Sequence, residues 1–164
     1  MAQPSSAAAE RQLKGFIAKF EPKNQAIIRA VRRALRRRLP SAFELVYDNY
    51  NFFVIGYGPN ERPSDAILSI AAGASGVGLC FIRGASLPDP AKVLLGSGKQ
   101  TRFVWLPTPV TLAQPPVARL IAAAVAQSRV PLPARGPGRL IIRSVSAKQR
   151  PRRKPSRRKT AGGG

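Results

Sequence analysis

Hydrophobic residues follow a helical spacing at both ends of the first 130 residues and a strand-like pattern between them. In residues 23–39 the apolar positions Ile27, Val31 and Leu35 recur every fourth residue, and Ile28 widens the same stripe. This spacing predicts three helices, at residues 12–20, 23–39 and 115–128. A proline lies close to an end of each segment, where helices start or stop.

Short apolar runs separated by turn-forming residues predict five strands between the second and third helices. These runs cover residues 43–47, 52–57, 66–71, 77–82 and 102–106. The pair Asp48-Asn49 and the run GASG at residues 73–76 are typical of the turns that join hairpins. Pro107 follows the fifth run and prevents its extension as a central strand.

The order of these elements predicts an α+β fold. We expect an antiparallel sheet of about five strands, with the N-terminal and C-terminal helices covering one of its faces. We assign residues 12–130 to one domain and residues 131–146 to an extension that holds a short edge strand at 139–145. Residues 147–164 are rich in basic residues and proline, and we expect them to form a disordered tail.

Charge is distributed unevenly over this order. The 164 residues include 28 Lys and Arg, seven Asp and Glu and no His, a net charge of +21. Residues 1–40 have a net charge of +8, residues 41–130 of +2, and residues 131–164 of +11. Two strongly basic segments therefore flank a nearly neutral middle, a distribution that favours polyanionic partners.

The same composition excludes most kinds of catalytic and metal-binding site. Without His, neither a Ser-His-Asp nor a Cys-His set can form. A Ser–Lys pair such as Ser97 with Lys99 remains open, but no spacing favours it. The single Cys80 lies in an apolar run and is interpreted as a buried thiol. We expect no catalytic residue, no metal and no cofactor, and lean against an enzyme.

Apolar stretches are too short to span a membrane, since about 18 uninterrupted residues are needed. The first residues, MAQPSS, do not resemble a secretory leader. These two observations predict a cytoplasmic protein without a membrane partner.

Two segments in the middle of the chain resemble a known family. Leu87-Pro88-Asp89-Pro90 and the run LLGSGKQTRF at residues 94–103 are similar to the signature region of YdhG-like domains, of the YjbR/CyaY (frataxin-like) superfamily. The resemblance covers residues 12–128. It implies a frataxin-like α–β–α sandwich, in a family whose function is mostly unknown.

Some frataxin-like proteins are described as iron chaperones that bind iron through acidic residues on the first helix. The equivalent helix here, residues 23–39, has six arginines and no acid. Ferrous iron prefers carboxylate or imidazole ligands, and the seven carboxylates of this chain are scattered. An iron chaperone is therefore the least favoured alternative.

A glycine-rich loop is one candidate anion site. It consists of Gly96, Ser97, Gly98, Lys99 and Arg102. A phosphate-binding Walker motif would require Gly and Ser or Thr where Val93 and Gln100 stand. A weaker site remains open, in which backbone N–H groups and the two cations hold a small anion or metabolite, for binding or catalysis. The competing interpretation is a flexible loop with both cations in solvent.

Two basic segments are candidates for non-specific contact with nucleic acid or another polyanion. The helix candidates are Arg29, Arg32, Arg33, Arg36 and Arg37, and the tail candidates are Arg150, Arg152, Arg153, Lys154, Arg157, Arg158 and Lys159. The competing interpretations are a solvated helix face and a solubilising tail. Tyr47, Tyr50 and Tyr57 either stack on bases or belong to the core. A third hypothesis is a structural or partner-docking module.

Overall fold

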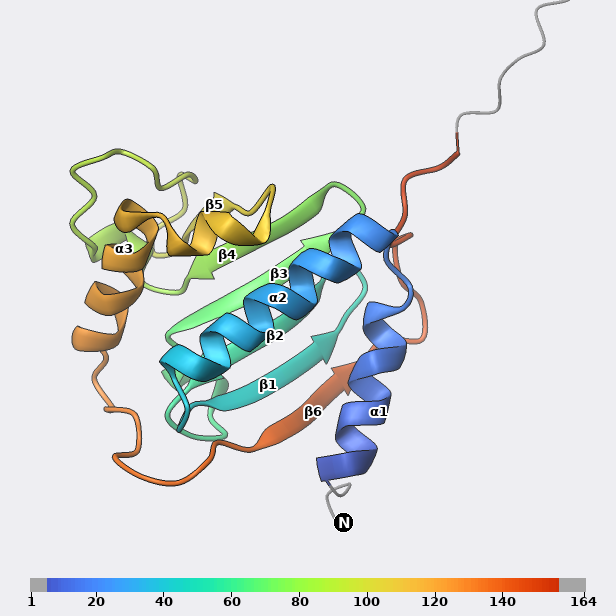
Figure 1. The fold of residues 1–164 in the computed structure, drawn as a ribbon, viewed down its shortest axis with the longest axis horizontal. Helices are drawn as coiled ribbons and strands as arrows, with labels where there is room; N and C mark the ends of the chain where they lie inside the picture. Colours follow the sequence, from blue (N-terminus) through green and yellow to red (C-terminus); the bar gives the residue numbers. More distant parts are fainter. Residues whose placement is uncertain (1–5, 157–164) are drawn as a thin grey trace, which may run out of the picture.

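A six-stranded sheet forms one layer of the molecule, and helices cover one of its faces (Figure 1). The computed structural model describes residues 6–156. The strand order is β5-β4-β3-β2-β1-β6. The strands are β1 (Phe43–Asp48), β2 (Phe53–Gly58), β3 (Leu68–Gly73), β4 (Gly76–Phe81), β5 (Arg102–Trp105) and β6 (Leu140–Val145). All neighbouring pairs are antiparallel except β1 and β6, which run parallel.

The helices are α1 (Ser6–Ile17), α2 (Pro22–Arg38) and α3 (Pro115–Ala126). Their apolar stripes join a single core with alternate residues of the central strands, such as Phe53, Ile70 and Leu79, which are fully buried. Because successive strand residues point to opposite faces, the intervening residues lie on the face that carries no helix. Two aromatic contacts illustrate this core: the rings of Phe16 and Phe20 lie 6.3 and 5.8 Å from that of Phe53.

The expected α+β class is confirmed, and each of the five apolar runs overlaps one of the strands β1 to β5, with shifts of a few residues at their ends. The expectation of an all-antiparallel sheet is wrong, because β6 adds a sixth strand parallel to β1. Residues 127–139 carry the chain from α3 to the far edge of the sheet. The pattern understated this strand since an edge strand alternates between buried and exposed positions and tolerates Arg143.

The first helix begins at Ser6, earlier than the predicted residue 12. Alanine has the highest helix propensity, and Ala9 is fully buried, so residues 6–11 also belong to the packed helix. Within residues 6–156, none of the helices has the length and apolar character that crossing a bilayer requires.

The expected disorder from residue 147 onward is also wrong for residues 147–156, which follow a defined path against the body. Arg150 N donates a hydrogen bond to Tyr50 O at 2.8 Å, and Arg152 is only 4% exposed. Buried polar contacts with the end of β1 therefore hold this segment despite its composition. Three of the tail candidates, Arg157, Arg158 and Lys159, lie outside the described residues.

Candidate polyanion interface

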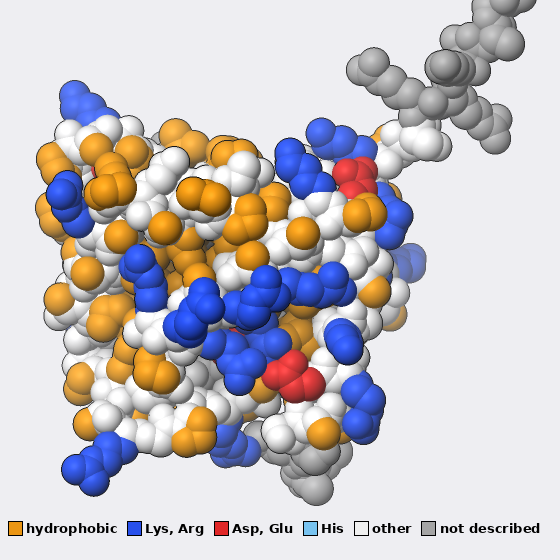
Figure 2. Space-filling view, in the orientation of Figure 1, with side chains coloured by type: hydrophobic (Ala, Val, Ile, Leu, Met, Phe, Trp, Pro, Cys, Tyr) orange, Lys and Arg blue, Asp and Glu red, His pale blue; other side chains and the backbone are white. Residues whose placement is uncertain are grey.

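A groove runs between α1 and α2 on the outer side of the helical layer. It has a volume of about 330 Å³. Its basic lining residues are Arg11, Lys14, Arg29, Arg32, Arg33 and Arg36, and Glu10 is the acid among the residues that line it. Figure 2 shows Lys and Arg side chains gathered in a band over this part of the molecule. The groove is thus a concentrated cationic surface.

The arginine row on α2 follows from the amphipathic pattern of that helix. Burial of Ile28, Val31 and Leu35 against the sheet turns the opposite face toward solvent. Arg29, Arg33 and Arg37 are exposed and stand four residues apart, so they form one line along the helix. Like charges at this spacing repel each other. Among the described residues, none of the three forms an ion pair with an acid.

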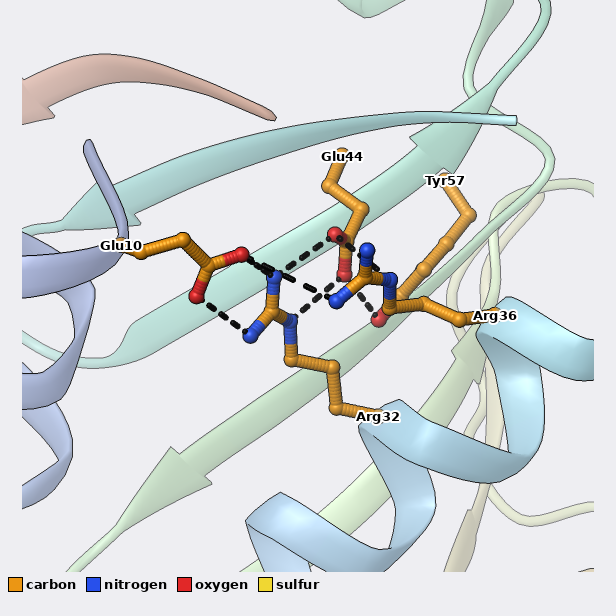
Figure 3. Close-up of polar contacts among 5 residues, drawn as sticks. All are labelled: Glu10, Arg32, Arg36, Glu44 and Tyr57. Atoms are coloured by element: carbon orange, nitrogen blue, oxygen red, sulfur yellow. Dashed lines mark hydrogen bonds and ion pairs between the residues drawn. The ribbon is translucent and has the colours of Figure 1, made fainter. Parts of the chain in front are cut away.

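Arg32 points the other way and ties both helices to the sheet (Figure 3). Its Nε and Nη2 donate to the Glu44 carboxylate at 2.9 and 3.0 Å, and its Nη1 and Nη2 donate to Glu10 at 3.0 and 2.6 Å. Tyr57 donates its hydroxyl proton to Glu44 Oε2 at 2.8 Å. Arg36 stands farther off, 3.7 Å from Glu10 and 3.8 Å from Glu44. The assignment of Arg32 to polyanion contact is therefore corrected, because its guanidinium is already engaged by two carboxylates.

Ionisation within this network matches its geometry. The hydrogen bond from Arg32 lowers the pKa of Glu10, against an opposing effect of partial burial. Burial, together with the neighbouring charge of Glu44, raises the pKa of Tyr57 well above its usual value. Burial disfavours the charge of Arg32, but its hydrogen bonds to Glu10 and Glu44 raise its pKa overall. At neutral pH Glu10 and Arg32 are therefore charged, and the Tyr57 phenol is neutral.

The described residues offer no cluster of three or more metal-ligating side chains. Glu44 and Asp48, the two carboxylates on β1, are each bound to basic residues. Asp48 Oδ2 lies 2.7 Å from Lys19 Nζ, and Asp48 Oδ1 lies 2.9 Å from Arg152 Nη2. Burial opposes ionisation of Asp48, but hydrogen bonds led by that from Lys19 lower its pKa. These carboxylates stabilise the fold and present no open ligand set.

The tail candidates within the described residues divide into two groups. Arg150, Arg153 and Lys154 are exposed, and Arg150 lies 5.7 Å from the centre of the Tyr50 ring. Arg152 is buried against Asp48, so its assignment to polyanion contact is also corrected. Sequence alone does not separate these residues, because all four lie in one basic run.

The glycine-rich loop lies at the other side of the sheet, before β5. Its residues 96–100 are exposed. Arg102 Nη1 donates to the carbonyl oxygens of Gly98 and Thr101, the latter at 2.9 Å. These carbonyl oxygens point toward Arg102, and its guanidinium therefore stabilises the loop by hydrogen bonds. Lys99 is exposed in the same loop.

The three tyrosines have different positions. Tyr57 is buried in the core, whereas Tyr50 is 51% exposed and Tyr47 is half-buried. Phe52 and Trp105, which line the open sheet face, are exposed to a similar extent as Tyr50, at 55% and 49%. Phe52 and Trp105 were both assigned to expected strands, and neither was predicted as a binding residue. The signal available in the sequence was the alternation of Phe103 and Trp105 along the fifth strand.

Comparison of this chain with protein-family models, curated proteins and solved structures finds no match. The resemblance to YdhG-like domains thus stays a prediction, and the geometry of the described residues is the basis for a functional proposal.

Proposed function

We propose that this protein is a non-enzymatic nucleic-acid-binding protein that contacts phosphates through the cationic face of α1 and α2. The observation that carries this proposal is the exposed row of Arg29, Arg33 and Arg37, which has no acidic partner among the described residues. Guanidinium groups bind phosphate oxygens in a bidentate manner, so phosphates would relieve the repulsion within the row. Such contacts read no base sequence, and we expect binding without sequence preference.

The basic tail adds to this surface in our proposal. Arg153 and Lys154 are exposed close to the start of α2, where Arg153 Nε donates to Lys19 O and Lys154 N donates to Glu21 Oε1, each at 3.2 Å. A polyanion on the helix face would therefore meet the tail as well. We do not include the glycine-rich loop, because Arg102 is engaged with carbonyl oxygens of its own loop.

The proposal is tested by the salt dependence of binding. Fluorescence anisotropy of a labelled DNA duplex gives the binding constant at several salt concentrations, and the slope of log K against log salt counts the phosphates contacted. The double variant Arg29→Gln/Arg33→Gln should reduce the magnitude of this slope by about 1.8, since each contact contributes about 0.9 for duplex DNA. Circular dichroism would confirm that both exposed changes leave the fold intact.

A matched control is Arg62→Gln/Arg119→Gln. Both of these arginines are exposed and lie away from the α1–α2 groove, and the net charge falls by the same amount. The control should keep the slope of the unchanged protein. Equal slopes for the two double variants would show that net charge alone drives binding and would contradict a site on α2.

Truncation after Ser156 measures the contribution of the remaining tail. It removes Arg157, Arg158 and Lys159 but retains the Arg152–Asp48 ion pair. We expect the magnitude of the slope to decrease by up to about 2.7 for duplex DNA, at about 0.9 for each of the three basic residues removed. An unchanged slope would assign phosphate contact to the helix face and to residues before 157.

A further inference from the structure

The sheet face that carries no helix contains a groove of about 540 Å³. Val77, Leu79 and Phe81 of β4 point into the core, so Gly78 and Cys80 lie on the opposite, open face. Together with Ala71 of β3, these residues form a floor with small side chains. The lining of the groove is largely apolar, which suits an aromatic ring.

Aromatic rings border this floor on both sides. A Cβ atom placed on Gly73 would lie 3.4 Å from Phe52 Cδ1, and one placed on Gly76 would lie 3.9 Å from Trp105 Cζ3. The rings of Phe52 and Trp105 therefore lie within van der Waals reach of these two glycines. Phe103 supports the indole edge-to-face, with ring centres 5.5 Å apart and planes at 85°. Trp105 nevertheless keeps about half of its surface exposed, at 49%.

The charge around the groove favours an anionic ligand. Among its described lining residues, Arg150 alone is charged. Arg150 lies 5.7 Å from the centre of the Tyr50 ring, which places a guanidinium beside a third exposed aromatic ring. An aromatic ligand with a phosphate next to it would satisfy both features.

The groove continues toward the cationic helix face. A second hollow of about 250 Å³ shares Ser75, Gly76 and Trp105 with it and reaches Lys23 and Asn24 at the start of α2. A chain lying over Trp105 can therefore pass around the β3–β4 turn to the arginines of α2.

We propose that this groove binds unpaired bases of single-stranded nucleic acid, which stack on Trp105 and Phe52 while Arg150 contacts a neighbouring phosphate. This inference rests on the proposed function and specifies its ligand as a single strand. Base stacking on aromatic side chains requires an unpaired base, because duplex bases are covered by their neighbours. A second copy of this chain is the less favoured occupant, since each copy has a net charge of +21 and like charges repel.

Trp105 makes the test direct, because it is the single tryptophan of the chain. The probes are a labelled oligothymidylate of about 12 nucleotides, within the usual range for such sites, and a duplex of equal length. We expect the single strand to quench Trp105 fluorescence and to bind more tightly than the duplex. Trp105→Ala should weaken single-strand binding about 5- to 150-fold, measured by anisotropy, and should change duplex binding little.

Two further variants separate stacking from charge. Phe52→Ala retains the Trp105 reporter and should also weaken single-strand binding selectively. Arg33→Gln should weaken binding of both probes while retaining the full quench at saturation. Circular dichroism of each variant verifies the fold.

Other results would contradict either the stacking site or the proposed function as a whole. Binding without a change in Trp105 fluorescence, and with full affinity in Trp105→Ala, would overturn the stacking site and leave the proposed function standing. Equal affinity for duplex and single strand would also overturn the stacking site and leave the proposed function standing. Failure of both probes to bind in dilute salt would overturn both proposals. Sedimentation showing a dimer that hides Trp105 would assign the groove to a second copy.

Discussion

The ion pair between Asp48 and Arg152 is the contact through which a single substitution should most change this fold. Asp48 is fully buried at the end of β1, and the Arg152 side chain is only 2% exposed. Arg152 Nη2 donates to Asp48 Oδ1 at 2.9 Å and to Asn49 O at 2.6 Å, but its Nε and Nη1 have no hydrogen-bond partner among the described atoms. Asp48 therefore carries most of the compensation for a buried guanidinium.

Asp48→Asn keeps the size of the side chain and removes its charge. Breaking one partner of a buried pair costs about 3–5 kcal/mol, because the remaining charge stays uncompensated. The substitution also removes the ion pair between Asp48 and Lys19 Nζ, which are 2.7 Å apart. The Lys19 side chain is 43% exposed and becomes hydrated instead, so this second loss should add little to the destabilisation. The free energy of unfolding of a whole domain is about 5–15 kcal/mol, so this loss is a large part of the stability.

Urea unfolding followed by circular dichroism measures this change, and Arg152→Met with the double variant completes the thermodynamic cycle. The double variant should be more stable than Asp48→Asn alone, because no buried charge is left without a partner. If the guanidinium escapes to solvent instead, trypsin should cleave between Arg152 and Arg153 faster than in the unchanged protein. A loss below about 1 kcal/mol without faster cleavage would refute the reasoning, since exposed pairs are worth that little.

Gly138, the carboxylates of Glu10 and Asp48, and the thiol of Cys80 each allow a further test of the structure. Gly138→Ala should destabilise the parallel β6–β1 pairing, because its Cβ would overlap the carbonyl oxygen of Ala42; unchanged amide-exchange protection of β6 would contradict this. The pKa values of Glu10 and Asp48 are lowered from 4.5 and 3.8, so their stabilisation is complete above those values and is lost as pH falls below them. Unfolding free energies that stay constant from pH 6 to about pH 3 would contradict that sign. Cys80 is partly buried, and this burial raises the pKa of its thiol, so iodoacetamide should alkylate it more slowly than a free thiol at neutral pH; equal rates would contradict the raised pKa.

Local periodicity explains why most of the fold was predictable. The stripe on α2 and the four hairpin strands are each encoded within about 20 residues, and proline marks several of their ends. β6 depends instead on a parallel partner almost 100 residues earlier, Leu45 opposite Ile141. No local pattern specifies such a pairing, so its edge position was foreseen but its direction and partner were not.

The candidate site was predictable in composition and not in orientation. The sequence places Arg29, Arg32 and Arg33 on one helix, yet Arg32 turns inward because Glu10 and Glu44 approach it from two other elements. The same holds for Arg152, whose buried partner Asp48 lies more than 100 residues away. The number of basic residues therefore overestimates the free cationic surface, because some of them, such as Arg32 and Arg152, form ion pairs with carboxylates that are distant in the sequence.

The affinity of the intact protein for an unstructured oligonucleotide, followed as salt increases, tests the central claim most directly. If Arg29, Arg33 and Arg37 contact phosphates, the slope of log K against log salt should have a magnitude of at least about 2, at roughly 0.7 per contact for a single strand. Absence of binding at about 50 mM salt, or binding that does not change with salt, would contradict it.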